Sequence, residues 1–202
     1  MPGVSDPAGV APRLGPEFDA AWVYASMLHR TQTRRGDKAV PFVSHLLGVA
    51  SLVIEEGGTE TQAIAALLHD AVEDQGGRPR LEEIRERFGV DVAAIVSACT
   101  DSDEDPKPPW RPRKEAYIAR LPDEPPEALL VCVADKLYNT RSILMDLREY
   151  GPRVFDEFAG RRDGTLWYYR TLVSTYRSIG FDSRLVDELD RTVTQIETLA
   201  GT

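Results

Sequence analysis

The chain has 202 residues and a formal net charge of −9 at pH 7, with 42% hydrophobic and 28% charged residues. This length is enough for one domain with a buried core and short for two. No apolar run approaches the roughly 18 residues that predict a membrane span. The acidic surface disfavours DNA and anionic membranes, because both are bound through Lys and Arg that neutralise phosphates. We therefore expect no DNA partner and no membrane partner.

The N-terminal residues 1–16 are rich in Pro, Gly and Ala and lack both a basic start and a long apolar stretch. This pattern predicts a flexible tail rather than a signal peptide, followed by one domain over residues 17–202. Cys99 and Cys132 each lie in an apolar run, which favours buried free thiols in a reducing compartment and leaves a disulfide as the alternative. These features predict a cytoplasmic protein.

Apolar residues recur at helical spacing through nearly the whole chain. Thr59 and Gln62, three residues apart, form a capping-box signature for one of the helices. The β-branched stretch 90–99 resembles a strand, but its neighbours favour a helix, and no hairpin signal is present. We predict an all-α, single-domain helical bundle, with a proline-rich loop over residues 101–113. The expected helices cover residues 18–34, 41–56, 59–75, 81–88, 90–99, 115–121, 127–150, 163–179 and 185–199.

The most informative feature is the run 65–74, where an apolar stretch ends in His69-Asp70 and then Glu73-Asp74. Side chains four residues apart lie on one face of a helix, so His69 aligns with Glu73 and Asp70 with Asp74. Three carboxylates on one turn repel one another unless a cation offsets their charge. The run therefore predicts a metal site with an acid or base beside it.

Two more residues extend this candidate site. His45 lies in an otherwise apolar helix, where a buried imidazole needs a partner. Asp135 ends an apolar run, and a metal or a salt bridge, for example with Arg141, would remove the cost of burying its charge. Asn139 lies one turn further on and faces the same way. His29, in polar surroundings, is interpreted as an ordinary histidine rather than a ligand.

Two imidazoles and two carboxylates form a mixed nitrogen and oxygen set that suits Mn²⁺, Fe²⁺ or Zn²⁺. Glu73 and Asp74 would orient a water molecule or move its proton, the alternative being two solvated acids near a helix end. Arg34 and Arg35 would supply the positive charge that the acidic surface lacks. The alternative for them is two solvated arginines at a helix C-terminus.

The motifs, in this order, resemble those of the HD-domain metal-dependent phosphohydrolases. More closely, they resemble the hydrolase domain of the RelA/SpoT family, in particular its small stand-alone, metazoan SpoT homologue-like members. A bare His-Asp pair is a weak signal, whereas five motifs in order are a strong one. The matching segments are residues 29–35, 41–45, 65–74, 88–92 and 133–141.

The resemblance implies an HD-type helical bundle that holds one Mn²⁺, or another divalent metal. It implies removal of the 3′-pyrophosphate from guanosine tetraphosphate or pentaphosphate, so the partner is a small guanosine nucleotide, and a homo-oligomer stays open. By position, it implies metal ligation by His45, His69, Asp70 and Asp135, catalytic acids at Glu73 and Asp74, and substrate contacts from Arg34, Arg35, Asn139 and Tyr168.

Departures from the family pattern fall in segments that face the substrate. Phe42 stands where a tyrosine is usual, Leu46 where a proline is usual, and Arg35 where a lysine is usual, while the loop 103–113 also differs. Two alternatives therefore stay open. One is an HD phosphohydrolase acting on another nucleotide or on NADPH. The other is a catalytically silent nucleotide-binding module, against which the intact acidic pair argues.

Overall fold

The computed structural model describes residues 14–35, 39–104 and 106–201, and these ranges are helical, with one isolated β-bridge and no sheet. The all-α prediction is confirmed. None of the helices described is both long and apolar enough to cross a membrane. The elements are α1 (Pro16–Leu28), α2 (Val43–Glu55), α3 (Glu60–Leu68), α4 (Ala71–Asp74), α5 (Gly77–Phe88), α6 (Val90–Cys99), α7 (Trp110–Arg120), η1 (Leu121–Asp123), α8 (Pro126–Tyr150), η2 (Gly151–Glu157), α9 (Arg161–Ser178) and α10 (Arg184–Ala200).

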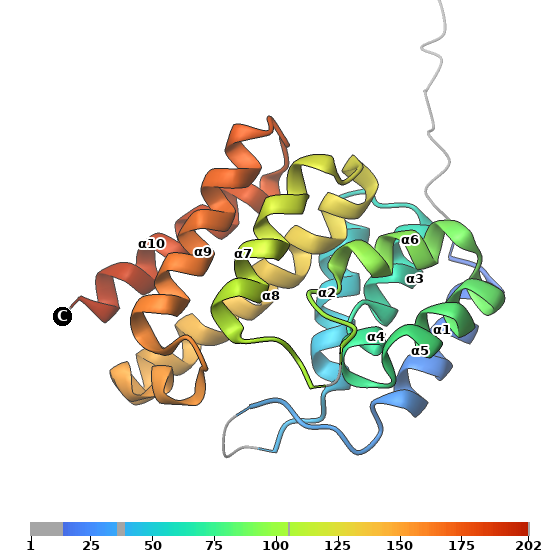
Figure 1. Cartoon of the computed structure of the whole chain (residues 1–202), viewed down its shortest axis with the longest axis horizontal. Helices are drawn as coiled ribbons and strands as arrows, with labels where there is room; N and C mark the ends of the chain where they lie inside the picture. Colours follow the sequence, from blue (N-terminus) through green and yellow to red (C-terminus); the bar gives the residue numbers. More distant parts are fainter. Residues whose placement is uncertain (1–13, 36–38, 105, 202) are drawn as a thin grey trace, which may run out of the picture.

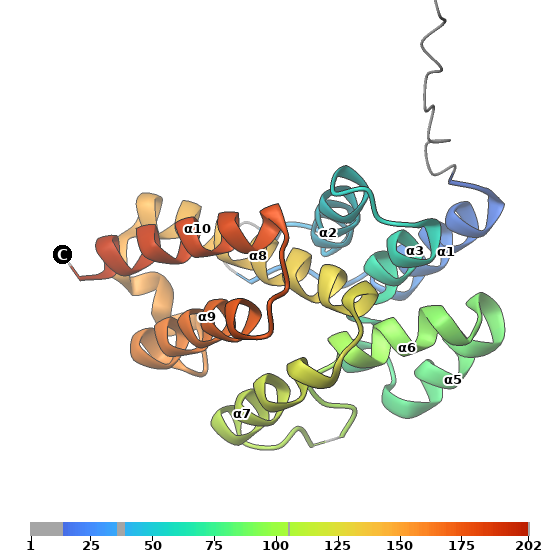
Figure 2. The ribbon, with the colours of Figure 1, turned by 90° about the horizontal axis from the view of Figure 1, so that it is seen from above.

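Helix α8 is the axis of the fold. It begins at Pro126, as suits a residue without a backbone N–H, and ends at Tyr150, just before Gly151, whose φ of +72° favours glycine. It packs against α2, α3 and α6 at one end and against α10 and η2 at the other. Figures 1 and 2 show α1–α6 gathered on one side and α9–α10 on the other, with α8 running between them. Residues of α8 therefore face both halves of the molecule.

Small and β-branched side chains let the helices approach α8 closely. A Cβ atom on Gly48 of α2 would overlap the ring of Tyr138, so this contact requires glycine.

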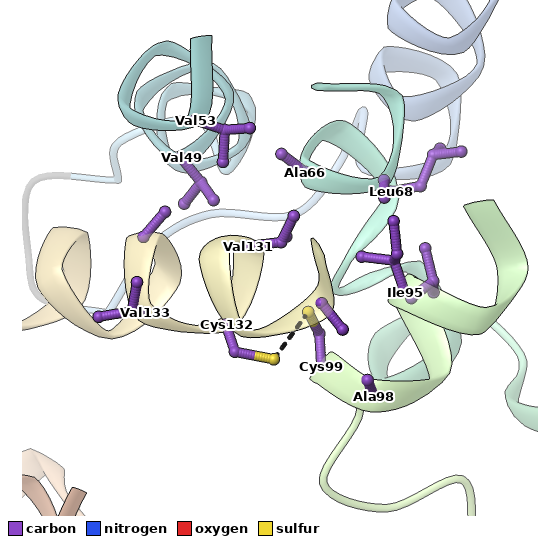
Figure 3. Close-up of a cluster of buried hydrophobic side chains, with 14 of the residues drawn as sticks. Val49, Val53, Ala66, Leu68, Ile95, Ala98, Cys99, Val131, Cys132 and Val133 are labelled. Carbon is purple, nitrogen blue, oxygen red and sulfur yellow. Dashed lines mark hydrogen bonds between the residues drawn. The ribbon is translucent and has the colours of Figure 1, made fainter. Parts of the chain in front are cut away.

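Cys99 and Cys132 are buried free thiols, as predicted, with their Sγ atoms 3.3 Å apart. Figure 3 shows this core, in which α8 contributes Val131, Cys132 and Val133, α2 contributes Val49 and Val53, α3 contributes Ala66 and Leu68, and α6 contributes Ile95, Ala98 and Cys99.

The first helix ends six residues before the prediction, at Leu28 rather than at residue 34. The polar run after it has no apolar face to bury, and its backbone pairs instead with the segment before α2. The N–H of Arg34 donates to the carbonyl of Val40 at 2.8 Å, and the N–H of Phe42 donates to that of Gln32 at 2.9 Å. Arg34 and Arg35 therefore lie on a loop, and the alternative of a helix C-terminus is wrong.

The other differences are local. The Thr59–Gln62 capping box is present, but the helix that it begins breaks at His69-Asp70, between α3 and α4. Helix α7 begins at Trp110, five residues before the prediction, which shortens the proline-rich loop. The predicted tail, residues 1–16, lies outside the described residues except for positions 14–16, where α1 already begins at Pro16.

An ion network ties the loop before α7 to the body of the fold. The Asp101 side chain is 2% exposed and accepts hydrogen bonds from Arg113 at 2.5 and 2.6 Å and from Lys114. Burial raises the pKa of Asp101, but Lys114 and Arg113 more than offset this and lower that pKa to about 2. The network anchors the first turn of α7 and, with it, the loop that precedes it.

This pairing predicts a pH-dependent contribution to stability. The pKa of Asp101 is about 2 in the fold against 3.8 for the free side chain. Its contribution is therefore complete above about pH 4 and is lost as the pH falls toward 2, amounting to about 2 kcal/mol at neutral pH. We expect Asp101→Asn to lower the free energy of unfolding by about that amount at pH 7, as measured by urea denaturation.

The matched control is Asp163→Asn, since the Asp163 side chain is 91% exposed. The control should leave stability unchanged. The difference between wild type and Asp101→Asn should shrink as the pH is lowered from 4 toward 2. A difference that stays constant over that interval would contradict the assigned pKa.

Candidate metal centre and catalytic cleft

Four predicted ligands come from three different segments and meet beside the middle of α8. His45 lies in the first turn of α2, His69 and Asp70 form the junction of α3 and α4, and Asp135 lies on α8. The two histidines and Asp135 are at most 4% exposed. The break after Leu68 places two consecutive side chains at the site, which an unbroken helix would direct to different faces.

The ligand atoms lie at the spacing expected around one ion. His45 Nε2 and His69 Nε2 are 3.0 Å apart, and Asp70 Oδ2 lies 3.2 and 3.1 Å from them. Asp135 Oδ1 lies 3.3 Å from His45 Nε2 and 3.6 Å from His69 Nε2. Ligand atoms held at about 2.1 Å from one metal ion are themselves roughly 3 Å apart. The structure thus brings together all four residues that the sequence analysis proposes as ligands.

Orientation and charge at the site also fit a cation. His69 Nδ1 lies 2.8 Å from the carbonyl of Ala66, and a proton donated there directs the Nε2 lone pair toward the cluster. Burial opposes a charged His69, yet Asp70 and Asp135 hold its pKa well above 6.5. The pKa values of both carboxyl groups are held well below the usual range despite burial. In the metal-free site, protonated His69 balances part of this carboxylate charge, and a divalent ion would take the place of its proton.

Asp135 has a cationic neighbour that the sequence analysis did not name. Lys136 Nζ pairs with Asp135 Oδ2, and Asn139 Nδ2 donates to Oδ1 at 2.5 Å. The proposed alternative partner, Arg141, instead faces Glu188 at 3.6 Å. Asn139 also accepts a hydrogen bond from Arg34 at 2.9 Å, which links the ligand helix to the arginine loop. The buried Lys136 follows directly after an apolar run, and this was the signal available in the sequence.

Glu73 and Asp74 lie on α4 at the edge of the cluster, with side chains 21% and 26% exposed. Lys107 Nζ lies 2.9 Å from Glu73 Oε1 and 3.6 Å from Asp74 Oδ1, and Gln32 donates to Asp74 at 2.8 Å. Burial, Asp101 and Asp70 raise the pKa of Glu73, against the opposing effect of Lys107. A carboxyl group with a raised pKa is suited to proton transfer near neutral pH.

A cleft of about 450 Å³ opens beside these acids. Both predicted acids, both predicted arginines and Tyr168 line it, together with Trp110 and three cations from the loop and α7. Those cations are Lys107, Arg113 and Lys114. Lys107 was missed by the sequence analysis, although its place in the proline-rich loop was a usable signal. The positive lining supplies the local charge that a phosphate-bearing substrate needs on an acidic protein.

Two further predicted residues occupy packed positions. Tyr168 is 4% exposed, its hydroxyl is buried without a hydrogen-bond partner, and its ring lies 6.3 Å from that of Trp110. It forms a wall of the cleft. His29 is buried outside the metal cluster, where its ring stacks on Phe42 at 4.9 Å and its Nδ1 contacts Gln32. This position agrees with the interpretation of His29 as a non-ligand.

Comparisons with known proteins give the family of the chain and several relatives. A family model described as HD domain matches residues 21–165. The chain is 39% identical over 136 residues to the Xenopus tropicalis guanosine-3′,5′-bis(diphosphate) 3′-pyrophosphohydrolase MESH1, covering 66% of this chain and 71% of that protein. It is 30% identical over 171 residues to the Drosophila melanogaster protein of the same name, covering 83% and 89%.

Two solved structures are similar to this chain in both fold and sequence. A structure described as a metazoan orthologue of SpoT that hydrolyses ppGpp superimposes with a TM-score of 0.76 at 29% identity, covering 92% of this chain and 98% of that one. A structure from Listeria monocytogenes gives a TM-score of 0.66 at 30% identity, covering 80% and 99%. Because the family model spans more than half of its length, the chain belongs to the HD domain family.

Proposed function

We propose that this protein is a Mn²⁺-dependent hydrolase that removes the 3′-pyrophosphate of guanosine tetraphosphate or pentaphosphate, leaving GDP or GTP. The observation that carries the proposal is the convergence of four ligand atoms beside a cleft that holds two acids and a set of cations. The printed activity of the MESH1 relatives supports the choice of substrate. We further propose a cytoplasmic location, because Cys99 and Cys132 are buried free thiols, as is usual in a reducing compartment. We propose no DNA partner, because the net charge is negative.

The ligand set supports a divalent ion, and its two imidazoles and two carboxylates suit Mn²⁺. His45, His69, Asp70 and Asp135 would hold it. When bound, such an ion polarises a phosphoryl oxygen and lowers the pKa of water. An HD domain implies a divalent metal, whereas the choice of Mn²⁺ rests on the ligand chemistry and on the family resemblance.

The acids on α4 would manage the proton. Hydrolysis breaks the bond between the ribose 3′ oxygen and phosphorus, so a proton leaves the attacking water and one reaches the departing 3′ oxygen. Glu73, with its raised pKa, is suited to accept the first proton and to return it. Asp74, fixed by Gln32, would orient the water. Lys107, now paired with Glu73, would transfer its contact to the pyrophosphate of a bound substrate.

The remaining predicted residues would hold the nucleotide. Arg34 and Arg35 line the cleft and would contact the base or the phosphates. Asn139, between Arg34 and Asp135, would hold the ribose, and Tyr168 would form a wall of the nucleoside pocket. These roles predict that the substrate lies across α8, with its 3′ end at the metal.

The direct test is incubation with Mn²⁺ and guanosine tetraphosphate, followed by measurement of pyrophosphate and GDP. We expect stoichiometric formation of both products. A panel that contains NADPH and other nucleotides runs in parallel. No turnover of guanosine tetraphosphate at high enzyme concentration would overturn the proposal, and selective turnover of another member of the panel would replace its substrate.

Replacing Glu73 tests its role in proton transfer. We expect Glu73→Gln to lower kcat by roughly 10²–10⁴-fold, because the amide cannot carry the proton. Metal content and thermal stability should be unchanged. The matched control is Glu86→Gln, an exposed acid on α5 that should retain full activity. A Glu73→Gln protein as active as wild type would exclude the assigned role.

Metal binding should depend on pH. In the metal-free site the carboxylates raise the pKa of His69, so a proton competes with the ion as the pH falls. We expect one divalent ion per chain at saturating metal and pH 7.5, with an affinity that falls as the pH drops below the raised pKa of His69 and with activity lost below about pH 6. Titration calorimetry at several pH values would measure this, together with the release of protons on binding. Full metal occupancy well below that pH would argue against histidine ligation.

A further inference from the structure

A second cavity borders the catalytic cleft and is not used by the hydrolytic chemistry. It has a volume of about 470 Å³ and shares Arg34, Arg35 and Glu157 with the cleft. Residues from the C-terminal half of α8, including Ser142 and Asp146, line the cavity. A narrower space lined by Asn139, Ser142 and Asp146 lies along the same helix. The cavity is therefore where a nucleotide would extend beyond the residue proposed to hold its ribose.

Asp146 is the acid in this cavity that is free to bind a ligand. It is half-buried, and within the described part of the chain its carboxylate has no hydrogen bond and no ion pair. The other two acids of the lining differ. Asp156 has a side chain that is 77% exposed and pairs with Arg161, and Glu157 is exposed on η2. A half-buried carboxylate without a protein partner is hydrated in the free protein and is available to accept hydrogen bonds from a ligand.

Helix α8 places this carboxylate in line with the metal centre. Asp135, Asn139, Ser142 and Asp146 follow one another at spacings of four, three and four residues, which keeps them on one face of the helix. Asp146 lies eleven residues after Asp135, or about 16 Å further along at ~1.5 Å per residue. A nucleotide with its 3′ phosphorus at the metal and its ribose at Asn139 would present its base to Asp146.

We propose that Asp146 is the specificity-determining residue that selects guanine, by accepting hydrogen bonds from N1–H and the N2 amino group of the base. The inference rests on the proposed function and names the contact that makes the substrate a guanosine nucleotide. An ionised carboxylate has two acceptor oxygens and no donor. The guanine edge offers two adjacent donors, whereas the adenine edge offers an acceptor at N1 beside its N6 donor, so only guanine satisfies both oxygens.

The test compares three substrates that differ only in the base. Wild type, Asp146→Ala and Asp146→Asn are assayed with Mn²⁺ on the 3′-pyrophosphate 5′-diphosphates of guanosine, inosine and adenosine. We expect wild type to prefer the guanosine substrate over the adenosine substrate by roughly 10–100-fold in kcat/KM, because this is the range that one hydrogen bond to a charged group contributes. Asp146→Ala should lose that preference through a lower rate on guanosine, with little change on adenosine.

The inosine substrate and two further variants test which atoms of the base Asp146 contacts. Inosine lacks the N2 amino group, so wild type should discriminate against it and Asp146→Ala should not. Asn presents one donor and one acceptor, which match the adenine edge, so Asp146→Asn should shift the ratio toward adenosine. The control Asp156→Asn changes an acid of the same cavity that already pairs with Arg161, and it should keep the wild-type ratio. Affinities for GDP and ADP measure the same preference without turnover.

The outcomes separate the two proposals. Turnover of guanosine tetraphosphate by wild type, with a guanosine-to-adenosine ratio unchanged in Asp146→Ala, would overturn the role of Asp146 and leave the proposed function intact. No turnover of any of the three substrates by wild type would overturn the proposed function, and this inference with it. Thermal denaturation of each variant verifies that a changed ratio comes from folded protein.

Discussion

The structure depends on the concentration of opposing charges at one buried point. Each of the two imidazole nitrogens, from His45 and His69, lies within 3.6 Å of the other and of a carboxylate oxygen from both Asp70 and Asp135. The two histidines and Asp135 are buried. Charges of this kind are costly to bury unless a cation balances them. The close packing of α2, α3 and α6 around α8 is what brings the donors together, through glycine, alanine and valine at the contacts.

A second electrostatic pattern surrounds this point. The chain carries a formal charge of −9, yet the cleft beside the acids is lined by cations from the arginine loop, the proline-rich loop and α7. Asp101 holds Arg113 and Lys114 at one wall of the cleft, while Lys107 lies against Glu73. The cleft thus has a cationic lining on a protein whose net charge is negative. Local charge, rather than net charge, decides what can enter.

Helix α8 connects the separate parts of the proposed site. Along one face it carries Asp135, proposed as a metal ligand, Asn139, proposed to hold the ribose, and Asp146, proposed to bind the base. Because a helix is rigid over this length, the distance between the reacting phosphorus and the base is set by sequence spacing along one element. In this proposal, residues at different positions along one face of the same helix serve the chemistry and the specificity, so a change in one need not disturb the other.

The sequence by itself determined the helical class, the ligand candidates and the acids beside them, since each rests on local spacing and on the chemistry of a few residues. Tertiary structure alone decided the break at His69-Asp70, the early end of α1, the pairing of Lys136 with Asp135, and the approach of Lys107 to Glu73. It also placed Asp146 in a cavity that shares its arginines with the cleft. These features join residues that are distant along the chain, or depend on how neighbouring helices pack, and neither is encoded in local periodicity.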